Sequence, residues 1–230
     1  LVGKTILSSK GYGMFVDFYL SGNVIMNIGD GVSARYYNPG DKVPANYQLL
    51  LTFKDESFLV FTVAMYGFIS AYPDAVIDNK YYTISRESIS PLSDAYTEAE
   101  FEKLFAFAKK TLTAKALLAT EQRIPGVGNG VTQDILFNAG IHPKQKVFDL
   151  SDGQKGVLFK SLKDTLMAMT SGRGRDTQTD LYGNEGGYKT ILSSKTWKNP
   201  CPRCGSVIVK EAYLGGSVYY CSECQKIRKT

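Results

Sequence analysis

The chain has 230 residues, of which 43% are hydrophobic and 12% aromatic, and it carries a formal net charge of +5. No apolar run is long enough to cross a bilayer, and the first residues lack the charged start and long apolar core of a secretory signal. The sequence therefore excludes a membrane-spanning chain, and it predicts a soluble, intracellular (cytoplasmic) globular protein with two compact domains.

The charge is unevenly distributed along the chain. Residues 1–96 hold seven Lys and Arg against nine Asp and Glu, whereas residues 97–230 hold twenty against thirteen. The basic surplus therefore belongs to the second half. A surplus of this size is compatible with a phosphate-rich ligand but does not require one, because many solvated surfaces carry as much charge.

The first part of the chain, residues 1–90, is predicted to be a β domain. Short segments rich in β-branched and aromatic residues, each bounded by turn formers, indicate strands. Hairpin turns are expected between some of them. The spacing favours an antiparallel sandwich or barrel. The predicted strands are 14–19, 24–26, 48–53 and 58–62, and the predicted turns are 21–23 and 54–57.

A helical domain is predicted over residues 91–194, after a linker at 89–93. The segment Thr97-Glu98-Ala99-Glu100 has the form of a capping box, with a side-chain acceptor followed three residues later by a carboxylate. A helix should start there. The apolar residues 101, 104, 105 and 108 continue this helix at helical spacing, and further helices are predicted over 114–120, 132–137 and 151–170.

Residues 123–130, Arg-Ile-Pro-Gly-Val-Gly-Asn-Gly, connect two of these predicted helices. The glycines let the backbone turn tightly, and Asn129 is expected to cap the helix that follows. Exposed amides at a helix start form an anion site that suits a nucleic-acid backbone, here at Gly128 and Asn129. The alternative is an interhelical turn that binds nothing. The only histidine, His142, is expected to be a structural cap rather than an acid or base.

All four cysteines lie near the end of the chain, as Cys201-Pro-Arg-Cys204 and Cys221-Ser-Glu-Cys224. The sixteen residues between the two pairs suit a hairpin that returns the second pair to the first and closes a tetrahedral site. Residues 195–230 are therefore predicted to form a structural Zn²⁺ finger without an open coordination position. The alternatives are two disulfides, or four unrelated buried thiols.

Two of these motifs together carry a family resemblance. Residues 124–130 followed by 134–144 are similar to the helix-two-turn-helix motif of the formamidopyrimidine-DNA glycosylase and endonuclease VIII family. Residues 199–225 resemble the C-terminal zinc finger of that family, including the glutamine after the last cysteine. The resemblance implies an α+β fold, in which an N-terminal antiparallel β-sandwich precedes a helix-two-turn-helix domain and a zinc-binding β-hairpin.

The resemblance also implies a function. Members of this family are base-excision repair DNA glycosylases with abasic-site lyase activity, which flip a damaged, oxidised base out of the duplex. The expected partner is therefore double-stranded damaged DNA, and we expect a monomer that binds no membrane. The alternatives are a damaged-DNA or abasic-site binder without catalysis, and an RNA-binding zinc-ribbon protein.

The catalytic residues stay unknown. In the family, an N-terminal proline amine attacks the sugar and a glutamate beside it assists, whereas this sequence starts at Leu1 and has no proline before Pro39. We expect that the sequence omits the natural amino terminus and the first helix of the family. Lys4 is an alternative Schiff-base former, because a desolvated lysine amine is a competent nucleophile.

The resemblance implies further DNA contacts in the first half of the chain. A family loop with two wedge arginines corresponds to residues 62–67, which lack both. Met65 and Tyr66 are expected to push into the base stack instead, because apolar or aromatic wedges suffice to unstack a step. The alternative is that they form a buried loop anchor.

In the second half, Asn129 matches an asparagine that clamps phosphates together with an arginine of the zinc hairpin, and Gly216 stands where that arginine is expected. Candidates to replace it are Arg203, Lys210 and Ser217.

Residues 171–188 are rich in glycines, hydroxyls and arginines, and in relatives the corresponding loop approaches the everted base. Arg173, Arg175 and Tyr188 are the expected contacts there. The alternative is a solvated connector.

Overall fold

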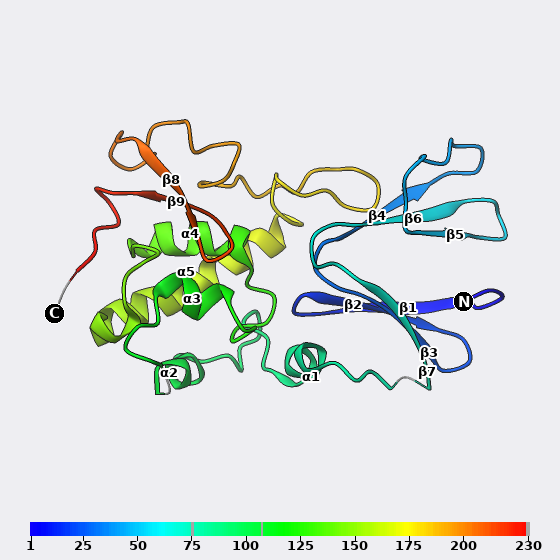
Figure 1. Cartoon of the computed structure of the whole chain (residues 1–230), viewed down its shortest axis with the longest axis horizontal. Coiled ribbons are helices and arrows are strands. Elements are labelled where there is room, and N and C mark those ends of the chain that lie inside the picture. Colours follow the sequence, from blue (N-terminus) through cyan, green and yellow to red (C-terminus); the bar gives the residue numbers. More distant parts are fainter. Residues whose placement is uncertain (75, 107, 229–230) are drawn as a thin grey trace. The chain divides into compact units, whose positions relative to one another are not determined.

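The structure is a computed structural model that describes residues 1–74, 76–106 and 108–228. The chain forms two compact units (Figure 1). The first unit contains Leu1–Ser88 and Gln178–Glu185, and the second contains Ile89–Thr177 and Gly186–Thr230. A short segment of the second half of the sequence thus belongs to the first unit. The predicted α+β class, with antiparallel strands first and helices and a cysteine-bearing hairpin later, is confirmed.

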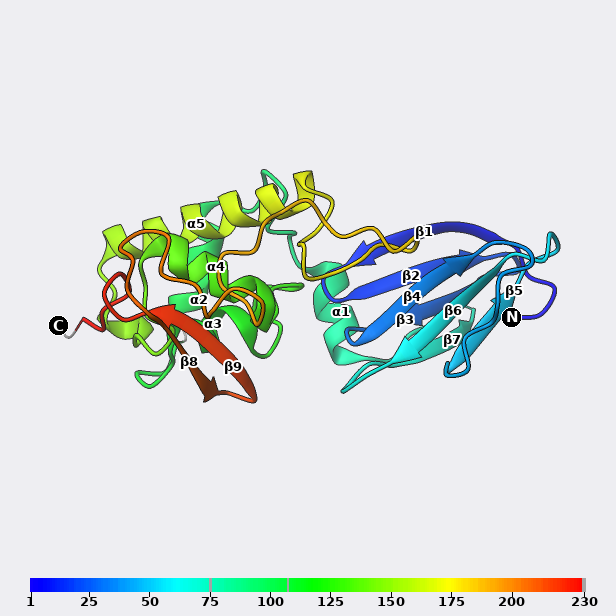
Figure 2. The same ribbon diagram turned by 90° about the horizontal axis from the view of Figure 1, so that it is seen from above.

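Two antiparallel sheets make up most of the first unit (Figure 2). Side chains from both sheets share one apolar core, in which Met26 and Phe61 are fully buried. The four predicted strands are present, and three further strands join them. One sheet has the order β1 (Ile6–Tyr12), β2 (Phe15–Leu20), β3 (Val24–Ile28) and β7 (Ile69–Pro73); the other has the order β4 (Val32–Tyr37), β6 (Phe58–Val63) and β5 (Leu49–Thr52).

The segment Gln178–Glu185 lies against β4. The Tyr36 N–H donates to the Leu181 carbonyl at 2.8 Å, and the Arg35 guanidinium donates to the Thr179 hydroxyl at 3.1 Å. The rings of Tyr36 and Tyr182 meet edge to face, with centroids 5.6 Å apart. These contacts cover part of an edge strand, which is otherwise a site for unwanted pairing.

Helix α1 (Lys80–Glu87) was not predicted from the sequence. It begins at the N-cap Asn79, whose side chain accepts from the Tyr81 and Tyr82 amides at 2.9 and 3.1 Å. The Tyr82 hydroxyl donates to the fully buried Asp17 carboxylate of β2 at 2.6 Å, and Asn27 of β3 donates to the same carboxylate at 2.5 Å. The buried charge is thus hydrogen-bonded on both oxygens, which holds α1 onto the sheet.

Alkaline pH is expected to weaken this attachment. Burial, followed by the hydrogen bond to Asp17, raises the pKa of Tyr82 to about 12. The unfolded chain loses this proton near pH 10, so the folded state retains it longer and the free energy of unfolding falls as pH rises from about 10 towards 12. Urea unfolding of the wild type and Tyr82→Phe should show a stability difference that shrinks across this window. Burial also raises the pKa of Tyr19, whose contribution remains in the variant; a pH-independent difference would contradict the assignment to Tyr82.

The second unit is helical, with a two-stranded hairpin near its end. Its core includes the fully buried Phe101 and Leu158. The predicted helix start at Thr97 is confirmed, because its hydroxyl accepts the Glu100 amide at 3.3 Å. Within the described residues, no helix is long and apolar enough to span a membrane. The elements are α2 (Glu98–Ala106), α3 (Ala114–Ala119), α4 (Asn129–Ala139), the 3-10 turn Val147–Asp149, α5 (Asp152–Ser171), β8 (Ile208–Tyr213) and β9 (Gly216–Cys221).

Candidate functional site

The four cysteines come together at the base of the β8–β9 hairpin. Their sulfur atoms all lie within 4.8 Å of one another, and no pair forms a disulfide. The Sγ atoms of Cys201 and Cys224 are 3.8 Å apart, and those of Cys204 and Cys221 are 3.4 Å apart. Four sulfurs around a tetrahedral ion at about 2.3 Å are separated by about 3.8 Å, whereas a disulfide requires about 2.0 Å. The cluster therefore fits a metal ion, and neither sequence alternative, disulfides or unrelated thiols, describes it.

Two polar side chains fasten the cysteine cluster to the end of α4. Gln225 is fully buried; its side-chain amide donates to the Ile141 carbonyl at 2.9 Å and accepts from the Cys221 amide at 2.9 Å. Arg203 donates to the Asn138 carbonyl at 3.0 Å, and its guanidinium lies 4.5 Å from the centroid of the Phe137 ring. The glutamine of the sequence motif thus has a structural task.

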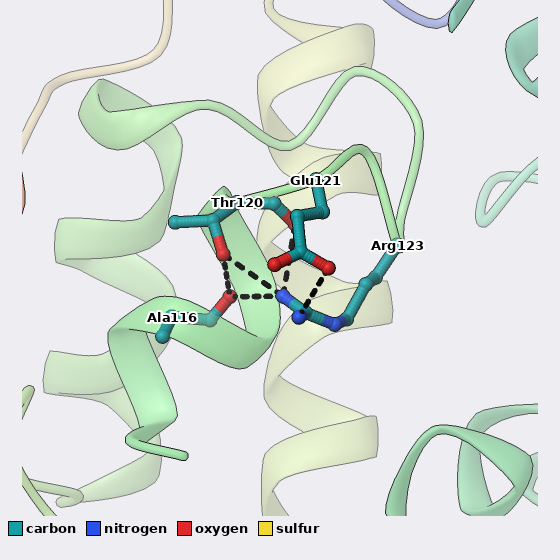
Figure 3. Close-up of polar contacts among 4 residues, drawn as sticks. All are labelled: Ala116, Thr120, Glu121 and Arg123. Carbon is teal, nitrogen blue, oxygen red and sulfur yellow. Dashed lines mark hydrogen bonds and ion pairs between the residues drawn. The ribbon is translucent and has the colours of Figure 1, made fainter. Parts of the chain in front are cut away.

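The connection between α3 and α4 is held by Arg123 (Figure 3). Its guanidinium donates to the carbonyls of Ala116 and Thr120, at 3.0 and 3.2 Å, and to the Thr120 hydroxyl at 2.8 Å. It also pairs with Glu121 at 2.6 Å. A cation at the last carbonyls of a helix adds charge-assisted hydrogen bonds and interacts favourably with the negative end of the helix dipole. Arg123 therefore fixes the path of the chain into the glycine-rich turn.

Replacing Arg123 by methionine should destabilise the second unit. The side chain is 23% exposed, and its loss removes partly buried, charge-assisted hydrogen bonds to two carbonyls and a hydroxyl, which costs about 1–3 kcal/mol. Glu121→Gln is the matched control, because Glu121 is 71% exposed and surface pairs contribute at most about 1 kcal/mol. Urea unfolding curves of both variants test this. Equal losses would mean that the ion pair, and not the carbonyl contacts, is the stabilising feature.

Helix α4 begins differently from the prediction. Asn129 is the first residue of the helix, the N-cap is Gly128, and no side chain caps the first turn. The Asn129 amide instead donates to the Ser217 carbonyl of β9 at 3.1 Å and accepts from Gln133 at 3.4 Å. The capping prediction for Asn129 was wrong, because a capping side chain must come from the residue before the first helical one. The amides of the first turn therefore have no side-chain acceptor.

His142 is structural, although it does not cap the helix. Gly140, in the left-handed conformation with φ of 66°, ends α4. The His142 Nδ1 atom accepts the Lys144 amide at 3.0 Å, and its ring meets the Tyr220 ring at 4.2 Å. Burial lowers the pKa of His142, which favours the neutral ring.

The hairpin brings Gly216 directly against Asn129. A Cβ atom at Gly216 would lie 3.1 Å from the Asn129 Nδ2 atom, which is tighter than ordinary contact. Of the residues expected to replace the missing arginine, Ser217 is the one in contact with Asn129. Arg203 is bonded at the far end of α4, and Lys210 lies over the Trp197 ring at 5.2 Å.

The segment that follows α5 places Arg175 beside the start of α4 and Tyr188 beside the buried Asp134. A Cβ at Gly130 would lie 3.0 Å from the Arg175 Cζ atom. Tyr188 is hydrogen-bonded through its hydroxyl to Asp134, and burial raises its pKa, so the structure gives it a supporting position. Arg173 is exposed. Base contacts by these residues stay predictions.

Asp134 was not recognised from the sequence as part of the site. It is fully buried in α4, and its two oxygens accept the Ile191 and Leu192 amides at 2.9 and 2.8 Å. Burial raises its pKa, and these hydrogen bonds oppose that shift. The available signal was a carboxylate immediately before the apolar run 135–137, where a charge requires a buried partner.

In the first unit, Met65 and Tyr66 project from the tip of the β6–β7 connection. They are 87% and 92% exposed, so the alternative of a buried loop anchor is wrong. Two backbone hydrogen bonds hold this connection: the Ala64 amide donates to the Gly31 carbonyl at 2.8 Å, and the Gly67 amide donates to the Ala64 carbonyl at 2.9 Å. Lys4 is also exposed and lacks the burial that would activate a lysine amine.

Three features define a helix-two-turn-helix protein with a cysteine-knuckle finger. They are the glycine-rich turn before α4, the four-cysteine hairpin beside that turn, and the antiparallel sandwich of the first unit. No protein-family model matches the chain. Curated proteins named formamidopyrimidine-DNA glycosylase do match: that of Mycoplasma mobile is 27% identical over 239 residues, covering 99% of this chain and 83% of the relative. That of Enterococcus faecalis is 26% identical and covers 99% and 82%.

Solved structures agree on the fold. The MutM (Fpg) protein from Thermus thermophilus superimposes with a TM-score of 0.79 at 22% identity, covering 99% of this chain and 85% of that one. Lactococcus lactis Fpg in complex with DNA containing an abasic site gives 0.82 at 22% identity, with 98% and 84% covered. The resemblance found in the sequence is confirmed: nearly the whole chain is similar to curated proteins named formamidopyrimidine-DNA glycosylase, and it has the fold of the solved Fpg structures.

Proposed function

We propose that this protein is a base-excision repair glycosylase with abasic-site lyase activity, which removes damaged, oxidised bases from double-stranded DNA. The observation that carries the proposal is the contact of Asn129, at the start of α4, with the Ser217 carbonyl of the cysteine hairpin at 3.1 Å. It joins the two motifs through which the family grips a phosphate backbone. Relatives named formamidopyrimidine-DNA glycosylase, and Lactococcus lactis Fpg bound to abasic-site DNA, support it.

The start of α4 supplies the proposed backbone contact. Its uncapped amides and the positive end of the helix dipole favour an anion at Gly128 and Asn129. Contacts of this kind position a protein on DNA without reading the sequence, which suits an enzyme that must find damage in any context. The exposed Met65 and Tyr66 are the proposed wedge, because unstacking by an inserted side chain offsets part of the few kcal/mol that base flipping costs.

The proposed ion in the cysteine cluster is zinc. Four thiolates in a closed set suit Zn²⁺ and leave no coordination position for a substrate, so the ion contributes folding energy and the hairpin geometry. The proposed working state is an intracellular monomer on damaged duplex DNA. No residue from 1 to 230 is assigned as the nucleophile.

Borohydride trapping on a duplex with one abasic site tests the enzyme assignment. The natural protein, with its own amino terminus, should form a covalent adduct with the opened sugar, and an otherwise identical undamaged duplex should give none. Tight binding to the abasic duplex without an adduct would replace the enzyme by a damage-binding protein. Affinity for structured RNA equal to that for abasic duplex would overturn both assignments in favour of an RNA-binding protein.

A further inference from the structure

A polar hollow of about 320 Å³ lies beside the start of α4, within the second unit. Its lining includes Asn129, Arg175, Thr177 and Ser217. The 11-residue helix α4 points its uncapped first turn here. A site of this kind favours an anion, because helix amides and a guanidinium converge on it.

Two glycines make this arrangement possible. At Gly130, a Cβ atom would lie 3.0 Å from the Arg175 Cζ atom, so any larger residue would displace the guanidinium. At Gly216, a Cβ atom would press on the Asn129 amide at 3.1 Å. The finger therefore presents no side chain of its own at position 216, while Arg175 reaches the hollow from the segment that follows α5.

One of the residues that line the hollow, Thr177, has a hydroxyl without a hydrogen-bond partner in the described structure. The Thr177 hydroxyl is buried and forms no hydrogen bond there. A buried hydroxyl costs about 1–3 kcal/mol unless a water or another group pairs with it. The donors that the hollow offers to an acceptor-rich group such as a phosphate are therefore the uncapped amides of α4 and the Arg175 guanidinium.

Arg175 is held in position through Asp134. Residues 172–176 and 186–188 pair closely, with the Gly187 amide donating to the Gly172 carbonyl at 2.7 Å and the Asp176 amide donating to the Tyr188 carbonyl at 2.9 Å. Tyr188, the bridge partner of Arg175, is in turn hydrogen-bonded to the buried Asp134. The helix that carries Asn129 thus also anchors the segment that carries Arg175.

We propose that Arg175 binds a DNA phosphate in this hollow together with Asn129, and so supplies the cation that Gly216 does not, with Asp134 as its positioning residue. The proposal rests on the proposed function and names the group that holds the backbone. Arg175 is then a phosphate contact, and not the contact with the everted base that was expected from the sequence. Glycine at 130 and at 216 is then a requirement of the site.

The first test measures the affinity for an abasic-site duplex by fluorescence anisotropy over a range of salt concentrations. Arg175→Gln should weaken binding about tenfold and reduce the slope of log affinity against log salt by about 0.9, the value for one phosphate contact. Gly130→Ala, which keeps the charge but displaces the guanidinium, should do the same. Lys54→Gln, an exposed charge in a turn of the first unit, is the control and should change neither. Unchanged affinity and slope in Arg175→Gln would overturn the proposal.

A second test identifies the contact without relying on the salt slope. Duplexes in which one phosphate at a time is replaced by a neutral methylphosphonate should include a position that weakens the wild type but not Arg175→Gln. Asp134→Asn should lose sensitivity at that same position, whereas a purely structural change would leave the phosphate pattern intact. If every methylphosphonate affects the wild type and Arg175→Gln equally, Arg175 does not contact a phosphate.

A third measurement uses the unaltered protein, in case a variant does not fold. Titration with inorganic phosphate, followed by NMR, should shift the amides of residues 129–131 and the Arg175 side chain; no shift there would overturn the proposal. Its failure is distinguishable from failure of the proposed function. A wild type that prefers abasic duplex, with variants that bind equally well, defeats only the phosphate assignment. A wild type without that preference, but with the predicted phosphate pattern, defeats only the repair function.

Discussion

Removal of the metal ion should unfold the cysteine hairpin and reduce the affinity for abasic duplex at least 100-fold. A two-stranded hairpin is marginal by itself, and the small core around Ile208 and Tyr219 includes two of the cysteines. Binding of a structural zinc ion contributes about 10–16 kcal/mol in finger peptides at neutral pH. Without the ion, the Ser217 carbonyl would no longer be held at Asn129, so the proposed backbone grip would be lost with the hairpin.

The experiment combines chelation with hydrogen exchange and DNA binding. Protection of β8 and β9 should vanish after verified metal loss, whereas the core around Phe101 and Leu158 should remain protected. Cys204→Ser should reproduce the effect, and Ser222→Ala, a position inside the second knuckle that is not a ligand, should not. Full DNA affinity in protein shown to be metal-free would contradict the proposed role of the finger.

Motifs with fixed spacing were predictable from the sequence. The knuckles predicted the cysteine cluster because a two-residue spacer directs both thiols to one point. Thr97 predicted a helix start because capping is a local interaction. Strands β2, β3, β5 and β6 were predicted because their β-branched and aromatic residues are a local strand signal, whereas β1, with its polar Ser8, Ser9 and Lys10, gives little signal.

Features that depend on tertiary contacts were not predictable. The docking of residues 178–185 on β4 depends on Arg35 and Tyr36, more than 140 residues earlier in the chain. The Asn129 side chain donates to a carbonyl of β9, and this tertiary hydrogen bond, not local capping, sets its direction. Asp134 has backbone partners more than 50 residues later, so its function as an anchor has no local pattern.

Gly67→Val should collapse the loop that presents Met65 and Tyr66. A Cβ at position 67 would lie 2.7 Å from the Gly31 carbonyl carbon and 3.0 Å from the Asp30 carbonyl oxygen, both backbone atoms. The chain must then separate and lose the Ala64 to Gly31 hydrogen bond, with a destabilisation of about 1–3 kcal/mol or more from overpacking. Urea unfolding measures the loss. We expect discrimination between abasic and intact duplex to fall with it.

Because Gly67→Val alters structure and presentation together, Met65→Gly separates the two. Met65 has φ of 52°, a left-handed conformation that costs about 1–2 kcal/mol for a residue with a Cβ and little for glycine. The variant should therefore gain up to about 1 kcal/mol of stability, since glycine also adds freedom to the unfolded chain. If Met65 is a wedge, the same variant should bind abasic duplex more weakly. A variant that is more stable but binds more weakly would identify Met65 as a strained functional residue. If stability rises and the affinity is unchanged, Tyr66 alone is the wedge, and Tyr66→Ser tests this.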